Sequence, residues 1–216
     1  MRIGVLGTGI VGTTLASRLV KNGHLVRLGS RTVDNVAAAQ WVAGHPDVSG
    51  QGTFASVAGW AELVINATGG LVSLEVLAAA GAHGLAGKVL IDVANPLDFS
   101  AGFPPTVVAH DGLSLGEQIQ LAFPDALVVK SLNTMNADVM VHPRSLSGSH
   151  SVFVASDHSE AKQIVSALLQ EFGWTPGEIV DAGGISASRG LELYLPLWLS
   201  LMGAMGSSHF NVAVVR

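Results

Sequence analysis

The sequence predicts an α/β fold built on a doubly wound parallel sheet, with a small α/β subdomain at the C-terminal end. The chain opens with a short apolar segment, residues 2–6, which a glycine-rich turn at residues 7–12 follows directly. Segments of strand character and segments of helical periodicity then alternate, as they do in parallel sheets with right-handed crossovers. The 216 residues, 49% of them apolar, suffice for a substantial core.

The predicted strands are short runs of β-branched and apolar residues. They lie at residues 2–6, 24–28, 53–54, 63–67, 88–93, 126–132, 151–155, 179–181 and 210–215. The predicted helices carry apolar residues at helical spacing, and several of them end at glycine. They lie at residues 13–20, 33–42, 73–82, 112–122 and 159–172, with a further helix at 186–205 that Pro196 is expected to kink. Residues 44–52 are expected to form a loop.

Ser147-Gly148-Ser149 has the composition of a linker and separates two predicted units. Residues 1–147 would form a dinucleotide-binding domain. Residues 148–216 would form a small C-terminal domain that packs on the rim of the sheet and completes a substrate cleft. About 70 residues is small for an independently stable unit.

The glycine-rich turn reads Gly7-Thr8-Gly9-Ile10-Val11-Gly12, a G-x-G-x-x-G pattern between a strand and a helix. In this context the pattern is typical of Rossmann-type dinucleotide sites. Gly7 would permit the tight turn, Gly9 the close approach of a pyrophosphate, and Gly12 the packing of helix on strand. The amides and positive dipole end of the following helix would face the diphosphate.

The residues after the second strand favour NADP over NAD. An NAD site places an acidic residue there to bind the ribose 2′-hydroxyl, but this chain has Gly29, Ser30 and Arg31. Ser30 can hydrogen-bond a 2′-phosphate, and Arg31 can grip it with its planar guanidinium group. Thr8 would add a third donor, whereas the charge of the nearby Asp34 would weaken the site.

Ligands of doubly wound sheets bind where the parallel strands end. Five short polar or glycine-rich segments occupy those positions and predict a cofactor crevice. They are residues 7–12, 29–31, 67–70, 94–96 and 133–136.

Composition excludes several other classes of function. The net charge of −5 and the lack of a basic run argue against nucleic-acid binding. With no cysteine, the chain has no disulfide, thiolate metal ligand or cysteine nucleophile. The apolar stretch at residues 191–205 is too short and interrupted for a membrane span. The first strand begins at the N-terminus without a signal peptide, so a cytoplasmic location is expected.

No residue is assigned a catalytic role, and no metal site is expected, because the histidines lack the spacing of metal ligands. The candidates for a proton shuttle are Lys130, His110, His142 and His209, of which only Lys130 ends an apolar strand near the predicted cleft. Asp92 is expected to hydrogen-bond nearby backbone.

The segment at residues 191–205 is apolar on nearly every side, more than one small core can cover. A second subunit in a twofold homodimer would cover the remainder. Tyr194 and Trp198 would share one helical face, either in the core, at the subunit interface, or stacked on a flat cofactor ring.

Four segments together resemble the family of F420-dependent NADP oxidoreductases: the glycine turn, Gly29-Ser30-Arg31, residues 129–136 (VKSLNTMN) and residues 189–198 (RGLELYLPLW). The resemblance covers essentially the whole chain and is strongest to a bacterial branch. It implies a hydride passed between NADP(H) and the deazaflavin coenzyme F420, held between a Rossmann domain and a small C-terminal domain.

The resemblance also implies roles for individual positions. Thr8, Ser30 and Arg31 would hold the 2′-phosphate, and Gly9, Ile10 and Val11 the diphosphate. Two loops, Ala67-Thr68-Gly69 and Ala94-Asn95-Pro96, would flank the ribose and nicotinamide, and Asn133 and Met135 would form a wall near the reacting rings. Asp34 and the sequence Asn133-Thr134-Met135-Asn136 depart from the archaeal members, so the electron partner carries over less firmly than NADP does.

Three functions stay open at this stage. One is hydride transfer between NADP(H) and the deazaflavin, which needs two rings held together but no acid or base. Another is NADPH-dependent reduction of a small carbonyl, imine or quinone-like substrate. The third is NADP(H) sensing without turnover.

Overall fold

Eight strands of the part of the chain that the structure describes form one sheet, in the order β10-β9-β8-β5-β4-β1-β2-β3. The structure is a computed structural model, and it describes residues 1–108 and 112–215. The sheet strands are β1 (Arg2–Leu6), β2 (Leu25–Ser30), β3 (Ser49–Thr53), β4 (Leu63–Asn66), β5 (Val89–Asp92), β8 (Leu127–Ser131), β9 (Val152–Ala155) and β10 (Ile179–Gly183). The strands β6 (Leu97–Asp98) and β7 (Thr106–Val107) form a separate antiparallel pair.

Neighbouring strands of the sheet run parallel except at one place, where β8 and β9 are antiparallel. From β3 to β8 the strand order is that of a dinucleotide-binding sheet. The chain adds strands toward one edge from β1 to β3 and then, from β4 onward, toward the other edge, while β1 and β4 remain parallel. The predicted Rossmann-type α/β class is therefore confirmed. The two strands of the predicted C-terminal domain, β9 and β10, extend this same sheet. The division into units at residue 147 stays a prediction.

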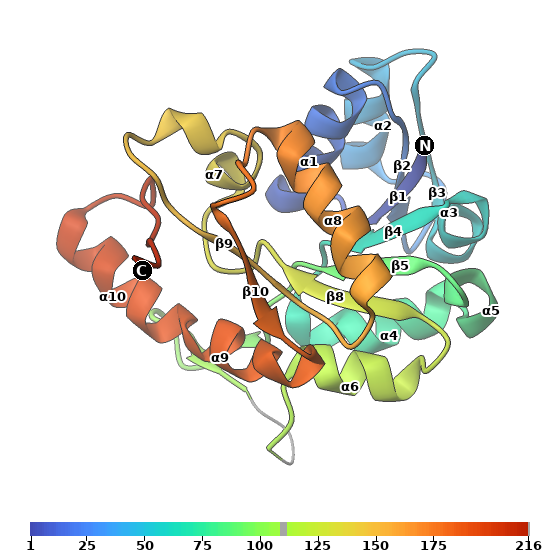
Figure 1. Cartoon of the computed structure of the whole chain (residues 1–216). Helices are drawn as coiled ribbons and strands as arrows, with labels where there is room; N and C mark the ends of the chain where they lie inside the picture. The colour runs from blue at the N-terminus through green and yellow to red at the C-terminus, as the bar shows by residue number, and fades with distance from the viewer. Residues whose placement is uncertain (109–111, 216) are drawn as a thin grey trace.

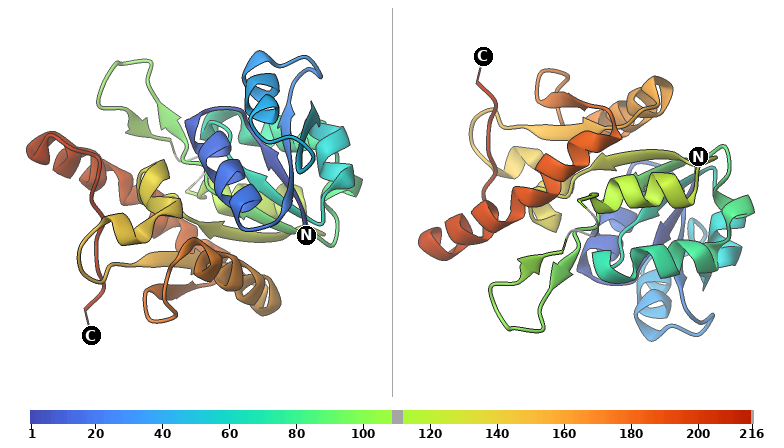
Figure 2. Two further views of the ribbon diagram at one scale, coloured as in Figure 1. Left: turned by 90° about the horizontal axis from the view of Figure 1, so that it is seen from above. Right: turned by 90° about the horizontal axis from the view of Figure 1, so that it is seen from below.

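Helices cover both faces of the sheet (Figures 1 and 2). One hydrophobic core lies beneath α1 (Ile10–Lys21), α2 (Val36–Ala43), α7 (Ala137–Val141) and α8 (Ser159–Phe172). The other lies beneath α3 (Phe54–Trp60), α4 (Ser73–Ala80), α5 (Ala82–Leu85) and α6 (Leu115–Ala122). The 3-10 turns η1 (Gly70–Val72), η2 (Pro143–Ser145) and η3 (Ile185–Ala187) connect elements, and α9 (Ser188–Leu193) and α10 (Leu195–Met205) end the helical part of the chain.

The sequence patterns account for these layers. The strands β4 (LVIN) and β5 (VLID) are buried along their whole length, as expected of central parallel strands with helices on both sides. The helix α8 buries one stripe of five residues, among them Val165 and Phe172, and ends at Gly173 in the left-handed conformation. Fully buried strands and helices with one apolar face therefore pack as three layers, helices on each side of the sheet, and leave the strand ends at its edge.

Two of the predicted strands were wrong. The third strand lies at Ser49–Thr53, mostly within the loop predicted at residues 44–52, and Thr53 ends this strand and caps α3, so that Phe54 is helical. Residues 210–215 form no strand, although the Ser151 amide donates to the Val212 carbonyl. The helix expected at 186–205 is present as η3, α9 and α10, and the break between α9 and α10 at Tyr194 lies two residues before Pro196, where a kink was expected.

The helix lengths exclude one further possibility. Across residues 1–108 and 112–215, no helix has both the length and the apolar character needed to cross a membrane.

Candidate functional site

Two adjoining cavities lie at the carboxyl edge of the parallel strands. The first, of about 530 Å³, is bordered by the ends of β1, β2 and β4, and by α3 and α4. The second, of about 430 Å³, lies toward β5, the Asn133 loop and α10. They share Ala67, Thr68, Gly69 and Val72, so the loop after β4 divides them. We call them the polar cavity and the apolar cavity.

The glycine turn has the geometry that its sequence predicts. Gly7 has φ +119°, a conformation that favours glycine, and a Cβ on Gly7 would collide with the Ala67 carbonyl. A Cβ on Gly12 would collide with the Gly7 carbonyl, so α1 packs directly against the turn. Gly9 is different, because a Cβ there meets no protein atom within 4 Å and Gly9 lines the polar cavity. The turn thus leaves space for a ligand at Gly9 alone.

The helix α1 points its N-terminus at this space. The helix begins at Ile10 with Gly9 as its N-cap, and it has neither a side-chain cap nor an acidic residue in its first turn. The amides of the first turn consequently have no side-chain acceptor, and the helix dipole adds partial positive charge. This arrangement suits a phosphate group.

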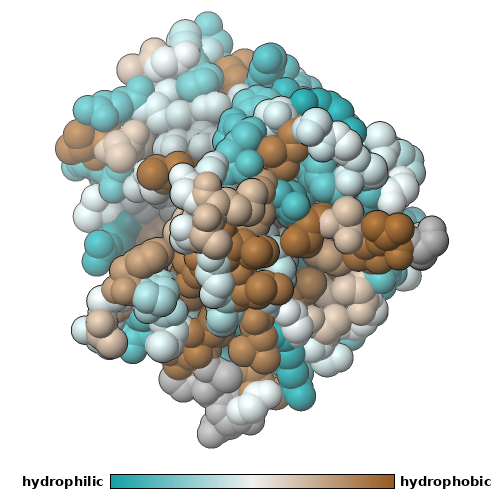
Figure 3. Space-filling model, turned by 90° about the vertical axis from the view of Figure 1, so that its left-hand side faces the viewer, coloured by the Kyte–Doolittle hydropathy of each residue, from teal (hydrophilic) through white to brown (hydrophobic). Residues whose placement is uncertain are grey.

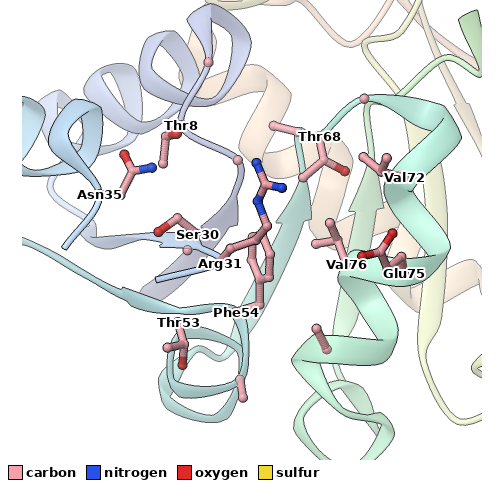
Figure 4. A pocket seen from close by; sticks show the side chains of 17 residues that line it. Thr8, Ser30, Arg31, Asn35, Thr53, Phe54, Thr68, Val72, Glu75 and Val76 are labelled. Atoms are coloured by element: carbon pink, nitrogen blue, oxygen red, sulfur yellow. The ribbon is translucent and has the colours of Figure 1, made fainter. Parts of the chain in front are cut away.

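The polar cavity places Arg31 at its centre (Figure 4). Thr8, Ser30 and Asn35 lie on one side of the Arg31 side chain, and Thr68, Val72 and Glu75 on the other. Arg31 is exposed at the end of β2 and makes no ion pair with any described residue. Its guanidinium group therefore keeps its donors for an anion in the cavity.

Two neighbours of Arg31 behave differently from the sequence expectation. The Ser30 hydroxyl donates its proton to the Thr32 carbonyl at 2.5 Å, so in this geometry it can only accept a further hydrogen bond. Asn35 accepts from the Ala38 amide as the cap of α2, which leaves its NH₂ group to donate. Asp34 does not line the cavity, and the acidic residue that does is Glu75.

The loop between the cavities is held by buried polar groups below it. The Thr68 hydroxyl donates to Asn66 Oδ1 at 2.7 Å, and Asn66 Nδ2 donates to Ser73 Oγ and to Asp92 Oδ1, each at 2.9 Å. Gly70 packs on the backbone of Asn95 without room for a Cβ. The two strand-end loops are consequently fixed relative to one another.

The apolar cavity has no charged residue in its described lining. Asn95 and Asn133 form a reciprocal pair at its base: Asn133 Nδ2 donates to Asn95 Oδ1 at 2.9 Å, and Asn95 Nδ2 donates to the Asn133 carbonyl at 2.8 Å. Met135 adds a sulfur, and Trp198 of α10, stacked on Phe210 at 5.4 Å between ring centroids, provides part of the far wall. Such a slot suits a flat, uncharged ring.

Lys130 does not reach either cavity. Its side chain is completely buried, and Nζ contacts Asp92 Oδ2 at 2.8 Å, Glu192 Oε1 at 2.8 Å and the Ala94 carbonyl at 2.5 Å. Burial acts to lower the pKa of Lys130, but the two carboxylates outweigh it and raise the pKa above its ordinary value. A permanently charged ammonium with all its donors engaged is poorly suited to shuttle protons.

The histidines considered from the sequence lie apart from the cavities. His142 contacts Asp138 at 2.9 Å, and His209 lies 3.7 Å from the same carboxylate. Neither lines the polar or the apolar cavity. His110 falls outside the described residues.

Most of the predicted site residues meet at the two cavities. The exceptions are Gly12 and Pro96, which are buried behind the linings, and Ile10, which is exposed on α1. Sequence reasoning missed the lining residues that come from elements folded over the strand ends. Only Asn35 and Thr53 among them carry a local signal, because each is a residue type that favours a helix N-cap. They are Asn35, Thr53, Phe54, Ala55, Val72, Glu75, Val76 and Ala79 in the polar cavity, and Leu71, Val72, Val93, Leu97, Phe99, Met140, Leu195 and Leu199 in the apolar one.

Comparison with known proteins adds sequence evidence to this geometry. Residues 2–96 match the family described as NADP oxidoreductase, coenzyme F420-dependent. The F420-dependent NADP reductase of Methanothermobacter marburgensis is 30% identical over 213 residues, which cover 93% of this chain and 92% of that protein. The rat metalloreductase STEAP3 is 31% identical, but this chain spans only 38% of its length, and it spans 36% of human STEAP2.

Solved structures agree with the fold. A crystal structure from Arthrobacter sp. FB24, provisionally named an F420-dependent NADP reductase, superposes with a TM-score of 0.94 at 48% identity over 100% of both chains. A reductive aminase from Aspergillus terreus, 17% identical with a TM-score of 0.67, covers 95% of this chain and 62% of its own, and shares the fold. Together with the matched family and the full-length archaeal relative, these findings show that the chain belongs to the F420-dependent NADP oxidoreductase family.

Proposed function

We propose that this protein transfers a hydride between NADP(H), bound in the polar cavity, and the deazaflavin coenzyme F420, with its ring in the apolar cavity. The observation that carries the proposal is the contrast between two cavities that share one loop. One has an open glycine turn, a helix N-terminus and Arg31, which suit phosphates. The other is uncharged over its described lining, which suits a ring.

The shared loop places the two binding regions side by side. Because Ala67, Thr68 and Gly69 line both cavities, a nicotinamide that extends from the polar cavity past this loop enters the apolar one. NADP(H) would supply the hydride. The protein would hold both rings in contact and exclude water, which are the requirements of direct transfer. Asn95 and Asn133, which line the apolar cavity, would orient the nicotinamide ring.

Two observations support transfer without a protein acid or base: Lys130 is buried outside both cavities, and the apolar cavity, over its described lining, offers no proton-transfer group. The described lining of the apolar cavity holds no Asp, Glu, Lys, Arg or His. A carbonyl reductase would need a proton donor in hydrogen-bond reach of its substrate.

Turnover with purified coenzymes tests the proposal. The protein is mixed with NADPH and oxidised F420, and the loss of the visible absorbance of oxidised F420 is followed, with NADH in a parallel sample. We expect fast reduction of F420 by NADPH and slow reduction by NADH. Reduction of a small imine, ketone or quinone with no reduction of F420 would show a small-molecule reductase, and NADPH binding without oxidation by any acceptor would show a sensor.

We further propose that the protein is a cytoplasmic homodimer, because NADPH is supplied inside cells and one face of α10 is uncovered. Leu197 and Met205 of α10 are each more than half exposed, as is Leu193 at the end of α9. Figure 3, viewed from the side where α10 lies in Figure 1, shows apolar side chains gathered over the centre and lower half of this face. A twofold contact between two copies would cover them.

A further inference from the structure

A chain of buried polar side chains runs beneath both cavities and ends in α9. It begins at Asn66 below the shared loop, continues through Asp92 and Lys130, and reaches Glu192. The exposed fractions of Asn66, Asp92 and Lys130 are 0%, and that of Glu192 is 2%. Four polar groups without solvent contact are costly to bury, so each must be paired.

Glu192 is the only one of the four on a helix outside the sheet. Its Oε1 receives the Lys130 ammonium at 2.8 Å and the Gly116 amide at 3.1 Å, and its Oε2 receives the Leu115 amide at 2.9 Å. One carboxylate therefore joins α9 both to β8 and to the first turn of α6. Because the interior screens charges weakly, these contacts fix the position of α9.

The helix α10, which continues directly from α9, is not fixed in the same way. Leu195 is its only buried residue in the described chain, yet Leu195, Trp198 and Leu199 line the apolar cavity. The position of this wall therefore depends on the anchoring of α9 one turn earlier. Asn133 Nδ2, which donates to the Leu191 carbonyl at 3.1 Å, is a second and uncharged anchor.

We infer that Glu192 is a positioning residue for the acceptor: through Lys130 it sets the distance of the α10 wall from the loop that divides the cavities. The inference rests on the proposed function for its kinetic test, and it predicts an effect on the acceptor side alone. The described lining of the polar cavity, where the proposal places the adenosine and phosphates of NADPH, includes neither Glu192 nor any residue of α10.

Glu192→Gln tests this directly, because the amide keeps the shape but loses the charge that holds Lys130. We expect the KM for F420 to rise about tenfold, with kcat changed by less than about threefold and the dissociation constant of NADPH within about twofold of wild type. Glu192→Asp, which keeps the charge but shortens the side chain, is the milder variant if Glu192→Gln does not fold, and should raise the KM for F420 by at least about threefold.

Arg189→Gln is the matched control. Arg189 lies one turn earlier on α9 and holds the same helix α6 through Glu117, at 2.6 and 2.7 Å, but it has no contact with Lys130. We expect its KM for F420 to stay within about twofold of wild type. An equal rise in both variants, or an unchanged KM in folded Glu192→Gln or Glu192→Asp, would overturn the inference.

Hydrogen–deuterium exchange gives a readout that needs no acceptor. Glu192→Gln should speed exchange over residues 195–205 and leave residues 10–21 unchanged, whereas Arg189→Gln should change neither. This pattern in a protein that does not reduce F420 would retain the positioning role and reject the proposed function. Unchanged exchange in Glu192→Gln would reject the positioning role.

Discussion

Gly12 packs directly on the carbonyl oxygen of Gly7, with no room for a side-chain atom between them, whereas Gly9, in the same turn, faces open space. The variants Gly9→Val and Gly12→Val should consequently fail in different ways. In Gly9→Val the added side chain occupies the phosphate region, so the protein should fold while NADPH affinity falls by at least about tenfold, or about 1.4 kcal/mol. Gly12→Val should lower the melting temperature, because α1 must move away from β1. Isothermal titration and thermal unfolding measure the two effects. Normal NADPH affinity in folded Gly9→Val would place the cofactor elsewhere.

Arg31→Ala should separate the two nicotinamide cofactors. Loss of a charge-assisted bond to the 2′-phosphate should cost about 1.5–3 kcal/mol of NADPH binding, while NADH binding stays nearly unchanged. Arg27→Ala is the matched control, because Arg27 lies on β2, the strand that Arg31 follows, but stacks on Trp60, 4.3 Å from the ring centroid. Equal losses for NADPH and NADH in Arg31→Ala would show that Arg31 does not recognise the phosphate.

Lys130→Met tests whether a proton shuttle operates. We expect kcat within about tenfold of wild type, because Lys130 lies outside both cavities, whereas a lost acid or base would cost about a thousandfold. The substitution leaves two buried carboxylates unpaired, so it should destabilise the fold by about 3–5 kcal/mol. Turnover is therefore measured well below the melting temperature. A thousandfold loss in a protein that is folded and binds NADPH would revive the small-molecule reductase.

Acid should weaken the junction of α6 and α9. Hydrogen bonds from Arg189, and then from the Ser114 amide and hydroxyl, hold the pKa of Glu117 at about 2, below its ordinary value of 4.5. Because the folded pKa is the lower one, the stabilisation is complete above about pH 4.5 and is lost as the pH falls toward 2. With Arg189 half exposed, we expect roughly 1–2 kcal/mol.

Glu117→Gln should remove that part of the pH dependence, which urea unfolding at several pH values measures. The control is Glu160→Gln, which changes an exposed carboxylate of α8 that makes no ion pair with any described residue. If the unfolding free energies of wild type and Glu117→Gln fell by the same amount below pH 4.5, Glu117 would not be the source of the acid sensitivity.

Leu197→Glu should disrupt the proposed dimer. The substitution places a charge on the exposed face of α10, so sedimentation should show a monomer at concentrations where wild type is a dimer. Ile164→Glu on α8 changes an exposed apolar residue elsewhere and should leave the dimer intact. A wild-type protein that sediments as a monomer on dilution, with no loss of thermal stability, would reject the dimer.

The sequence predicted the parts of the molecule that depend on local patterns. The glycine turn was correct because close packing and a positive φ at Gly7 each require glycine wherever the rest of the chain lies. The strand at residues 49–53 was missed because SGQGT has no apolar residue, as an edge strand allows. The last predicted strand was wrong because residues 210–215 have the composition of a strand but, in the described structure, share only the Ser151–Val212 backbone hydrogen bond with the chain ahead of β9 and form no continuous ladder.

The linings of the cavities were harder to predict, because they depend on tertiary contacts. Lys130 follows an apolar run at a strand end, the usual position of a cleft residue, but Glu192, 62 positions later, draws its ammonium into the interior. Phe54 and Trp198 reach the cavities only because α3 and α10 fold over the sheet. No spacing of residues within the sequence predicts which side chains of α3 and α10 reach the cavities.

The antiparallel pairing of β8 and β9 has a consequence for which parts of the chain supply the walls of the two cavities. Since β9 and β10 run against β8, their carboxyl ends lie at the edge opposite the cavities, and the chain then returns to the apolar cavity through α9 and α10. One wall of the apolar cavity, formed by Leu195, Trp198 and Leu199, consequently comes from a stretch of the gene that adds no residue to the described lining of the polar cavity. Changes confined to the codons for residues 195–205 would therefore reshape the apolar cavity and leave the lining of the polar cavity unchanged.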